Sequence, residues 1–248
     1  MKKGLIIASF GTTDIETRKK SIENIENGLK EAFPSYETVR CFTSRQVKRK
    51  IELREGKVIC NEIEALDALK EKGIAEEDIF IQPLHMIPGV EYEKLLKLGV
   101  KVGQPLLYDK ESIEKVVSLL DYPDPEEGNL VLFGHGTYHE SDWYYQGLQE
   151  ALDRAGKKNV YMITVEGQRT IEDILEKLIA SKKKVILKPF MIVAGVHARM
   201  DMASDDESSV RSIIESHGLE TEVLMEGLGE DPKIVEEFIL RGKDLLGE

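Results

Sequence analysis

The sequence feature that most constrains the fold is a buried-strand pattern that ends in a glycine-rich turn and recurs along the chain. Residues 130–133 (Leu-Val-Leu-Phe) lead into Gly134-His135-Gly136-Thr137, and residues 185–193 lead into Ala194-Gly195-Val196-His197. Short apolar runs bounded by turn residues are typical of strands that are buried on both faces of a parallel sheet. The pattern therefore predicts an open α/β fold with a histidine near each of two strand ends.

A third apolar run, residues 160–165, lies between these two and ends in Glu166-Gly167. Ligands of open α/β folds bind outside the carboxyl ends of the strands. His135, Glu166 and His197 taken together are suitable ligands for a divalent metal site with open positions. Each residue also has a structural interpretation, as a turn histidine, a first-turn glutamate or a helix N-terminal histidine. The functional interpretation is favoured because all three follow strands in one half of the chain.

Strand and helix patterns alternate along the whole sequence. Helical spacing of apolar residues, with glycine and proline as end signals, separates the helices from the strands. In the first half, strands are predicted at residues 5–8, 37–42 and 79–84, and helices at residues 17–32, 45–54, 62–72, 91–98 and 111–120. Strand–helix–strand units of this kind imply parallel sheets flanked by helices.

Two segments of the first half align without gaps, and in the same order, with segments of the second half. Leu5–Thr12 matches Leu130–Thr137, and Pro83–Glu91 matches Pro189–His197. This favours two similar α/β halves that face each other across a cleft. The polar segment 121–129, which contains two prolines and a glycine, is the best linker, so we expect an N-terminal half at 1–124 and a C-terminal half at 125–248 that carries the metal-site residues.

Composition excludes some classes of partner. The formal net charge of −12 argues against nucleic acid as a partner, because a phosphate backbone requires a basic surface. An anionic small molecule needs only local cations. Cys41 and Cys60 have no CxxC spacing, which fits a reducing compartment. The apolar stretch at the start is too short for a signal peptide, and no stretch approaches the ~20 residues of a membrane span. We therefore expect a cytoplasmic protein without a membrane partner.

Further motifs make the chain resemble a known family. The similarity runs almost from end to end, and its most specific part is His197-Ala198 leading into Asp201-Met202-Ala203-Ser204-Asp205-Asp206. The other matching segments are Ser9-Phe10-Gly11-Thr12, Phe42-Thr43-Ser44, Leu84-His85, Gly89–Lys94, Gly134-His135-Gly136, Val165-Glu166 and Gly227–Glu230. On these residues the chain resembles the anaerobic cobalt chelatases (sirohydrochlorin cobaltochelatases) of the class II chelatase superfamily.

The resemblance implies a chelatase-like fold, two α/β halves with a tetrapyrrole cleft between them, and roles for particular residues. His135, Glu166 and His197 would bind the cobalt ion and form the catalytic set, with His135 also accepting a proton. The sequence departs from the family at Glu166-Gly167-Gln168-Arg169, where a Glu-Ser-Tyr-Pro-like run is familiar, and at Val196, where an aspartate is familiar.

Substrate binding is expected at residues of both halves. Sirohydrochlorin carries eight carboxylates, so an acidic protein must supply local cations, for which Arg45, Arg49 and Arg199 are candidates. His85 has an alternative interpretation as a core histidine, and Arg45 as part of a solvated helix face. The expected substrate-binding residues are Ser9, Phe10, Gly11, Thr12, Arg45, His85, Glu91 and Arg199.

The expected function is insertion of Co²⁺ into sirohydrochlorin, a lyase reaction of anaerobic cobalamin biosynthesis. The partners are then sirohydrochlorin and Co²⁺, with Co²⁺ as substrate and no prosthetic group. Two alternatives stay open, a chelatase for iron or nickel or for another ring such as precorrin-2, and a non-catalytic carrier of cobalt or tetrapyrrole. The sequence also leaves the oligomeric state open, and a homo-oligomer is compatible with it.

Overall fold

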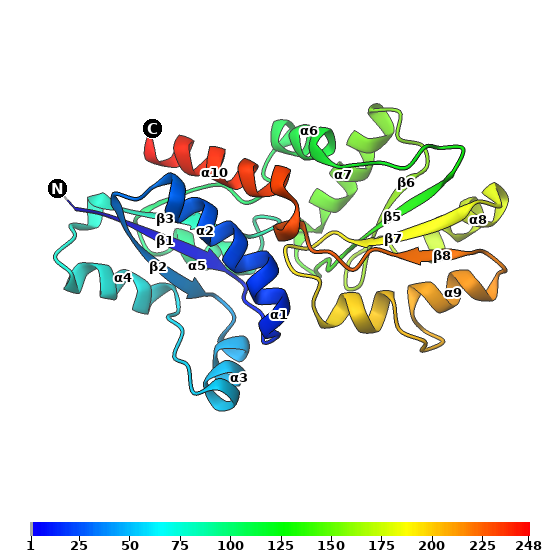
Figure 1. The fold of residues 1–248 in the computed structure, drawn as a ribbon. Coiled ribbons are helices and arrows are strands. Elements are labelled where there is room, and N and C mark those ends of the chain that lie inside the picture. Colours follow the sequence, from blue (N-terminus) through cyan, green and yellow to red (C-terminus); the bar gives the residue numbers. More distant parts are fainter. Residues whose placement is uncertain (1) are drawn as a thin grey trace. The chain divides into compact units, whose positions relative to one another are not determined.

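Two four-stranded parallel sheets organise the computed structural model, which describes residues 2–248 (Figure 1). Contacts within the chain define two units. Unit 1 comprises Met1–Tyr108 and Gly229–Glu248, and unit 2 comprises Asp109–Leu228. The prediction of two similar halves, each a parallel sheet flanked by helices, is confirmed. Within residues 2–248, no helix has the length and apolar character needed to cross a bilayer.

The sheet of unit 1 has the strand order β2-β1-β3-β4. Its strands are β1 (Lys3–Ser9), β2 (Tyr36–Phe42), β3 (Ile79–Pro83) and β4 (Lys101–Val102). The central strand β1 pairs with β2 and β3 at once, with Leu5 opposite Thr38 on one side and Phe80 on the other. The carboxyl ends of β1 and β3 flank the point where the strand order reverses, which is where open α/β sheets bind ligands.

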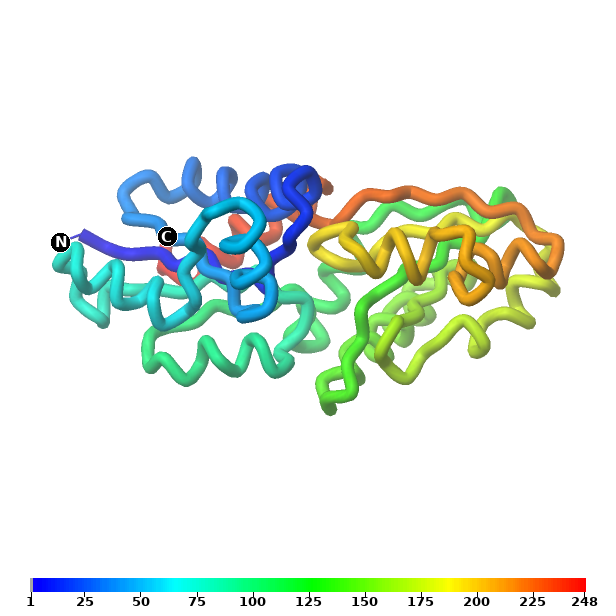
Figure 2. Tube along the Cα trace, turned by 90° about the horizontal axis from the view of Figure 1, so that it is seen from below, coloured from blue at the N-terminus to red at the C-terminus, as the bar shows by residue number. Residues whose placement is uncertain are grey.

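Helices cover both faces of this sheet. On one face, α4 (Glu62–Glu71) and α5 (Val90–Leu96) contribute Leu66, Leu69 and Leu95 to a core with β1–β3. On the other, α2 (Glu23–Ala32) packs against α10 (Pro232–Leu246), which is red in Figure 2. The remaining helices of this unit are α1 (Ile15–Thr17), the π-helical turn Arg18–Ile22 and α3 (Arg45–Glu55).

The sheet of unit 2 repeats this arrangement in the order β6-β5-β7-β8. Its strands are β5 (Gly128–Gly134), β6 (Val160–Thr164), β7 (Lys184–Pro189) and β8 (Thr221–Val223). One face packs against α8 (Glu172–Ser181), the π-helical turn Ala198–Met202 and α9 (Val210–Ser216). The helices α6 (Lys110–Leu119) and α7 (Trp143–Arg154) pack against each other, and α7 also packs on β6. Every residue of β5 is buried, as expected for the central strand of a covered parallel sheet.

Backbone hydrogen bonds at the strand ends match between the two units. The amide of Leu84 donates to the carbonyl of Ala8 at 2.7 Å, and the amide of Phe190 donates to the carbonyl of Phe133 at 2.7 Å. These are the positions that the internal alignment pairs. Gly11 and its aligned partner Gly136 both have positive φ, 93° and 74°. The sequence repeat therefore corresponds to a repeated strand-end geometry.

The units differ from the predicted halves, 1–124 and 125–248, in the placement of two helices. Helix α6 packs with α7 in unit 2 although it precedes residue 124. Helix α10 returns to unit 1, where Arg241 donates to the carbonyls of Pro105 and Leu106. The predicted strand 185–193 also ends early, at Pro189. After the Phe190 amide bonds to β5, the chain leaves the sheet and reaches His197 through a partly buried loop in which Val196 is exposed.

Candidate metal-binding site

His135, Glu166 and His197 all lie at the carboxyl edge of the sheet in unit 2. His135 follows β5 directly, Glu166 follows β6 by two residues, and His197 precedes the π-helical turn after β7. Because β6, β5 and β7 are parallel neighbours in the sheet, their carboxyl ends lie side by side at one edge. The fold thus brings together three residues that are far apart in sequence.

The three side chains are close and open to solvent. The rings of His135 and His197 have centroids 4.6 Å apart and meet edge to face at 79°. The Nδ1 atom of His135 lies 3.7 Å from Oε2 of Glu166. The side chains of His135, Glu166 and His197 are 41%, 42% and 40% exposed, so a ligand can reach each of them. Among residues 2–248, no group of three or more His, Cys, Asp or Glu side chains is already closed around a metal position.

Hydrogen bonding fixes the tautomer of His135. Its Nδ1 lies 3.0 Å from the carbonyl oxygen of Gly136. A carbonyl can only accept, so Nδ1 carries the proton and donates. The lone pair of the neutral ring is therefore on Nε2, where it is available to a metal ion or a proton.

His197 is oriented in the same way by a carboxylate. Its Nδ1 donates to Oδ2 of Asp201 at 2.7 Å, which again leaves the lone pair on Nε2. A histidine ligand that donates its other N–H to a carboxylate is held in ring orientation and gains basicity. Sequence reasoning did not place Asp201 in the site. The available signal was its position four residues after His197, a spacing that puts two side chains on one helical face.

The backbone joins the His135 loop to the Glu166 loop. The amide of Glu166 donates to the carbonyl of His135 at 2.8 Å, and the amide of Val165 donates to that of Gly134 at 3.1 Å. Gly136 is needed at this junction, because its φ is positive and a Cβ there would lie 2.4 Å from the amide nitrogen of Gly167. The backbones of the two loops therefore touch, and a side chain at residue 136 would force them apart.

A second polar cluster lies in unit 1, at the carboxyl ends of β1 and β3. Ser9 and His85 are buried, and Nε2 of His85 lies 3.3 Å from Oγ1 of Thr43. In the described part of the chain, Ser9 Oγ, His85 Nδ1 and Glu91 Oε2 are buried without a hydrogen-bond partner. Burial lowers the pKa of His85 to about 4, and the negative charge of Glu91 offsets this only in part. Unpartnered buried polar atoms require an explanation, and a bound ligand or water is the usual one.

The other predicted residues of the turn after β1 have different environments. Phe10 is 51% exposed, although it follows a buried strand. Gly11 adopts its positive φ against the ring of Phe42. Oγ1 of Thr12 accepts a hydrogen bond from the amide of Asp14 at 3.2 Å. The turn therefore presents an apolar ring to solvent beside the buried hydroxyl of Ser9.

Of the predicted cations, Arg45 is engaged within unit 1. Both of its terminal nitrogens bond to the carboxylate of Glu62, with Nη1 at 2.7 Å, and Nη1 also donates to the carbonyl of Thr43. Burial is the largest single influence on the pKa of Glu62 and acts to raise it, but hydrogen bonds and the positive charges of Arg45 and Lys94 together keep that pKa below its ordinary value. Arg199 lies on the π-helical turn two residues after His197 and is exposed.

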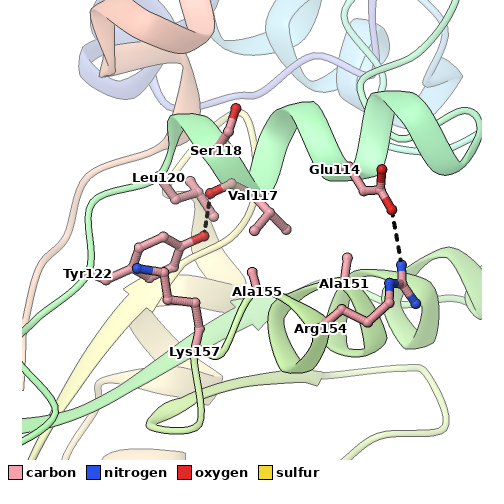
Figure 3. Close-up of a pocket in the computed structure, with 9 residues that line it drawn as sticks. All are labelled: Glu114, Val117, Ser118, Leu120, Tyr122, Ala151, Arg154, Ala155 and Lys157. Carbon is pink, nitrogen blue, oxygen red and sulfur yellow. Dashed lines mark hydrogen bonds and ion pairs between the residues drawn. The ribbon is translucent and has the colours of Figure 1, made fainter.

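A shallow groove lies elsewhere in unit 2, between α6 and α7 (Figure 3). Its floor is apolar, and at its rim Arg154 pairs with Glu114 at 3.6 Å while Lys157 lies over the ring of Tyr122 at 4.4 Å. None of the predicted site residues lines this groove. The predicted metal-binding residues of unit 2 therefore lie outside the groove between these helices.

Comparison with known proteins identifies the family of this chain. A family model described as cobalt chelatase (CbiK) matches residues 3–246. The chain belongs to the CbiK cobalt chelatase family.

Two curated relatives of this CbiK family member align over most of both chains. Sirohydrochlorin cobaltochelatase of Salmonella typhimurium is 31% identical, covering 96% of this chain and 94% of the relative. Sirohydrochlorin cobaltochelatase CbiKC of Nitratidesulfovibrio vulgaris is 30% identical, covering 92% and 85%. The solved structure of SirB from Bacillus subtilis with Fe³⁺ is similar in fold, with a TM-score of 0.63 at 15% identity, covering 99% of this chain and 96% of SirB. The predicted family and the chelatase fold are confirmed.

Proposed function

We propose that this protein inserts Co²⁺ into sirohydrochlorin, as an enzyme of anaerobic cobalamin biosynthesis. The observation that carries the proposal is the pair of imidazoles at the sheet edge of unit 2. Their centroids are 4.6 Å apart, and both have Nδ1 engaged by an acceptor and Nε2 left for a ligand. Membership of the cobalt chelatase family and the names of the two curated relatives support the choice of reaction.

Metal insertion requires three events: loss of water from the ion, presentation of the ring nitrogens, and removal of two ring protons. Nε2 of His135 and of His197 are neutral nitrogen ligands, which suit Co²⁺, and Glu166 supplies a negative charge that offsets the charge of the ion. Imidazole and carboxylate bind a divalent ion less tightly than thiolates would, so the ion can pass to the ring.

His135 is proposed to accept a proton from the ring as well as to bind the ion. Nε2 of His135 holds the one lone pair of the neutral ring, so it can accept a ring proton only once it has released the ion to the ring nitrogens.

Substrate binding is proposed for the residues expected from the sequence: Ser9, Phe10, Gly11, Thr12, Arg45, His85, Glu91 and Arg199. The unpartnered Oγ of Ser9 and Nδ1 of His85 supply polar atoms for substrate side chains, and exposed Phe10 supplies an apolar face for a ring. Arg199 is the cation closest in sequence to His197. Arg45 would have to exchange its bonds to Glu62 for bonds to substrate.

We also infer a cytoplasmic location, without a nucleic-acid or membrane partner. The backbones of Cys41 and Cys60 form an isolated parallel β-bridge, but their side chains are free thiols and not a disulfide. Free thiols fit a reducing compartment. The net charge of −12 disfavours a polyanion. A homo-oligomer remains compatible with these features.

A single-turnover assay tests the proposal against its alternatives. Metal-free sirohydrochlorin is mixed with the protein and with Co²⁺, Ni²⁺ or Fe²⁺ in turn, and the ring absorbance is followed. We expect the protein to accelerate cobalt insertion over the protein-free rate. Acceleration only with nickel or iron would make it a chelatase for that metal, and binding without acceleration would make it a carrier.

A further inference from the structure

Asp142 is a buried carboxylate that bonds to both of the loops carrying His135 and Glu166. It is 4% exposed and occupies the N-cap position of α7. An aspartate at this position normally accepts from an amide in the first turn of its own helix, but Asp142 makes no such bond. Its oxygens bond elsewhere in unit 2.

The two oxygens of Asp142 go to different loops. Oδ1 accepts from the amide of Thr137 at 3.0 Å, and Oδ2 accepts from the amide of Gln168 at 2.8 Å. Thr137 is two residues after His135, and Gln168 is two residues after Glu166. A charged acceptor makes stronger hydrogen bonds to backbone amides than a neutral one does. One carboxylate thus connects the segments on which both side chains are carried.

Gly167 is the residue that lets Asp142 reach this position. A Cβ at residue 167 would lie 2.3 Å from Oδ1 of Asp142 and 2.4 Å from Oγ1 of Thr164. Any other residue there would push the carboxylate away. The connection between the two loops therefore depends on the absence of a side chain at residue 167.

Arg169, at the end of the run 166–169, is held by α7 and β6. Its Nε donates to the carbonyl of Met162 at 2.9 Å, and its terminal nitrogens lie 3.3 and 3.4 Å from the side-chain oxygens of Gln146 and Gln149. The loop after Glu166 is therefore anchored at Gln168 and Arg169 by side chains at the start and middle of one helix.

We propose that Asp142 is a positioning residue, which sets the spacing of His135 and Glu166 by bonding to both loops. The inference rests on the metal site of the proposed function. Asp142 itself contacts neither ring nor ion. Outer groups that orient metal ligands typically contribute 10- to 100-fold to metal affinity.

Asp142→Asn tests the inference with little change of volume. The amide side chain can accept from one loop, but its NH₂ group then faces an N–H of the other. Asp173→Asn is the matched control, because Asp173 also accepts a backbone amide, that of Thr170 at 2.8 Å, but is exposed and joins no ligand loop. Amide hydrogen exchange should accelerate at Thr137, Gln168 or both in Asp142→Asn, and at neither in Asp173→Asn.

The deciding measurement is Co²⁺ affinity without the ring, titrated by the visible absorption of bound cobalt. We expect Asp142→Asn to weaken Co²⁺ binding about 10-fold and to leave sirohydrochlorin binding unchanged. If Asp142 acts through the Glu166 loop, the Asp142→Asn/Glu166→Gln double variant should bind Co²⁺ nearly as well as Glu166→Gln alone. Gly167→Ala should reproduce the loss by displacing the carboxylate.

Two results would overturn the inference. One is Co²⁺ affinity within twofold of the unmodified protein in Asp142→Asn, with amide exchange accelerated. The other is a double variant in which the two losses multiply, which would make Asp142 independent of Glu166. Failure of the proposed metal site looks different, because His135→Ala and Glu166→Gln would then bind Co²⁺ as tightly as the unmodified protein.

Discussion

The ring of His197 meets the ring of His135 edge to face at a centroid distance of 4.6 Å, although 61 residues separate them in sequence. The contact follows from the order of the strands, because β5 and β7 are neighbours and flank the point where the order reverses. With Nδ1 of both rings engaged by acceptors, the two Nε2 atoms are the free ligands of the pair.

His197→Ala should lose chelatase activity on the order of 100-fold at limiting Co²⁺, because it removes a proposed metal ligand. Loss of a group that only orients such a ligand already lowers metal affinity or activity by about 10- to 100-fold. The fold should persist, since the side chain of His197 is 40% exposed. Insertion rates from ring absorbance check this. His217→Ala is the matched control, because His217 is an exposed histidine at the end of α9. Near-normal rates in His197→Ala would contradict the metal site.

Glu166→Gln should weaken Co²⁺ binding about 10-fold and weaken sirohydrochlorin binding much less. The substitution removes a negative charge with little change of volume. Separate titrations of the two ligands check this, with Glu172→Gln, an exposed glutamate at the start of α8, as the control. Equal loss of both affinities would instead assign Glu166 a general structural role.

The maximal insertion rate should fall on the acid side even at saturating Co²⁺ if His135 accepts a ring proton. Protons compete with metal for imidazole, but saturating metal overcomes that competition. A required base must still be deprotonated in the complex. The acid limb should disappear with most of the activity in His135→Ala. A flat maximal rate from about pH 5.5 to 8, with insertion as the slow step, would leave His135 as a ligand only.

His85 should make the stability of the protein depend on pH. Burial lowers its pKa to about 4 in the folded state, from an ordinary value of 6.5. As pH falls, His85 is therefore protonated at a higher pH in the unfolded state than in the folded state. The contribution of neutral His85 to the free energy of unfolding is complete above pH 6.5 and is lost as the pH falls from 6.5 to 4. At pH 5 the loss is roughly 2 kcal/mol.

Urea unfolding at pH 7 and pH 5 measures this loss. The stability advantage of the unmodified protein over His85→Asn, which cannot titrate, should shrink by roughly 2 kcal/mol between the two pH values. His217→Asn should show no comparable change, because His217 is exposed. A stability difference between the unmodified protein and His85→Asn that is the same at both pH values would contradict a lowered pKa for His85.

Much of the fold was predictable because the local patterns and the tertiary structure agree. The runs at β1, β5 and β6 are apolar, short and ended by glycine or polar residues, and all three are strands. The edge strands β4 and β8 were missed, since two and three residues are too few for a periodic signal. The strand predicted at 185–193 ends at Pro189, because residues 190–193 are apolar but leave the sheet. In this loop Met191 and Ala194 pack in the core with α8 and α9 and not through strand pairing.

The site was predictable only where a residue adjoins a strand end. His135 and Glu166 follow strands within two residues, and the repeat located His197. The role of Asp142 gave no local signal, because its partner Gln168 lies 26 residues later and comes to it only through the sheet. The pairing of Arg45 with Glu62 was hidden for the same reason, since the two residues lie at the starts of different helices.

The return of α10 to unit 1 has a consequence for synthesis on the ribosome. Unit 1 is complete only when residues after Gly229 have emerged, whereas unit 2 is continuous from Asp109 to Leu228. At about 5–20 residues per second, unit 1 waits roughly 6–24 seconds after its first segment for its last helix. The second unit made can therefore be the first to fold, and a nascent chain stalled before Pro232 would expose the face of α2 that α10 covers.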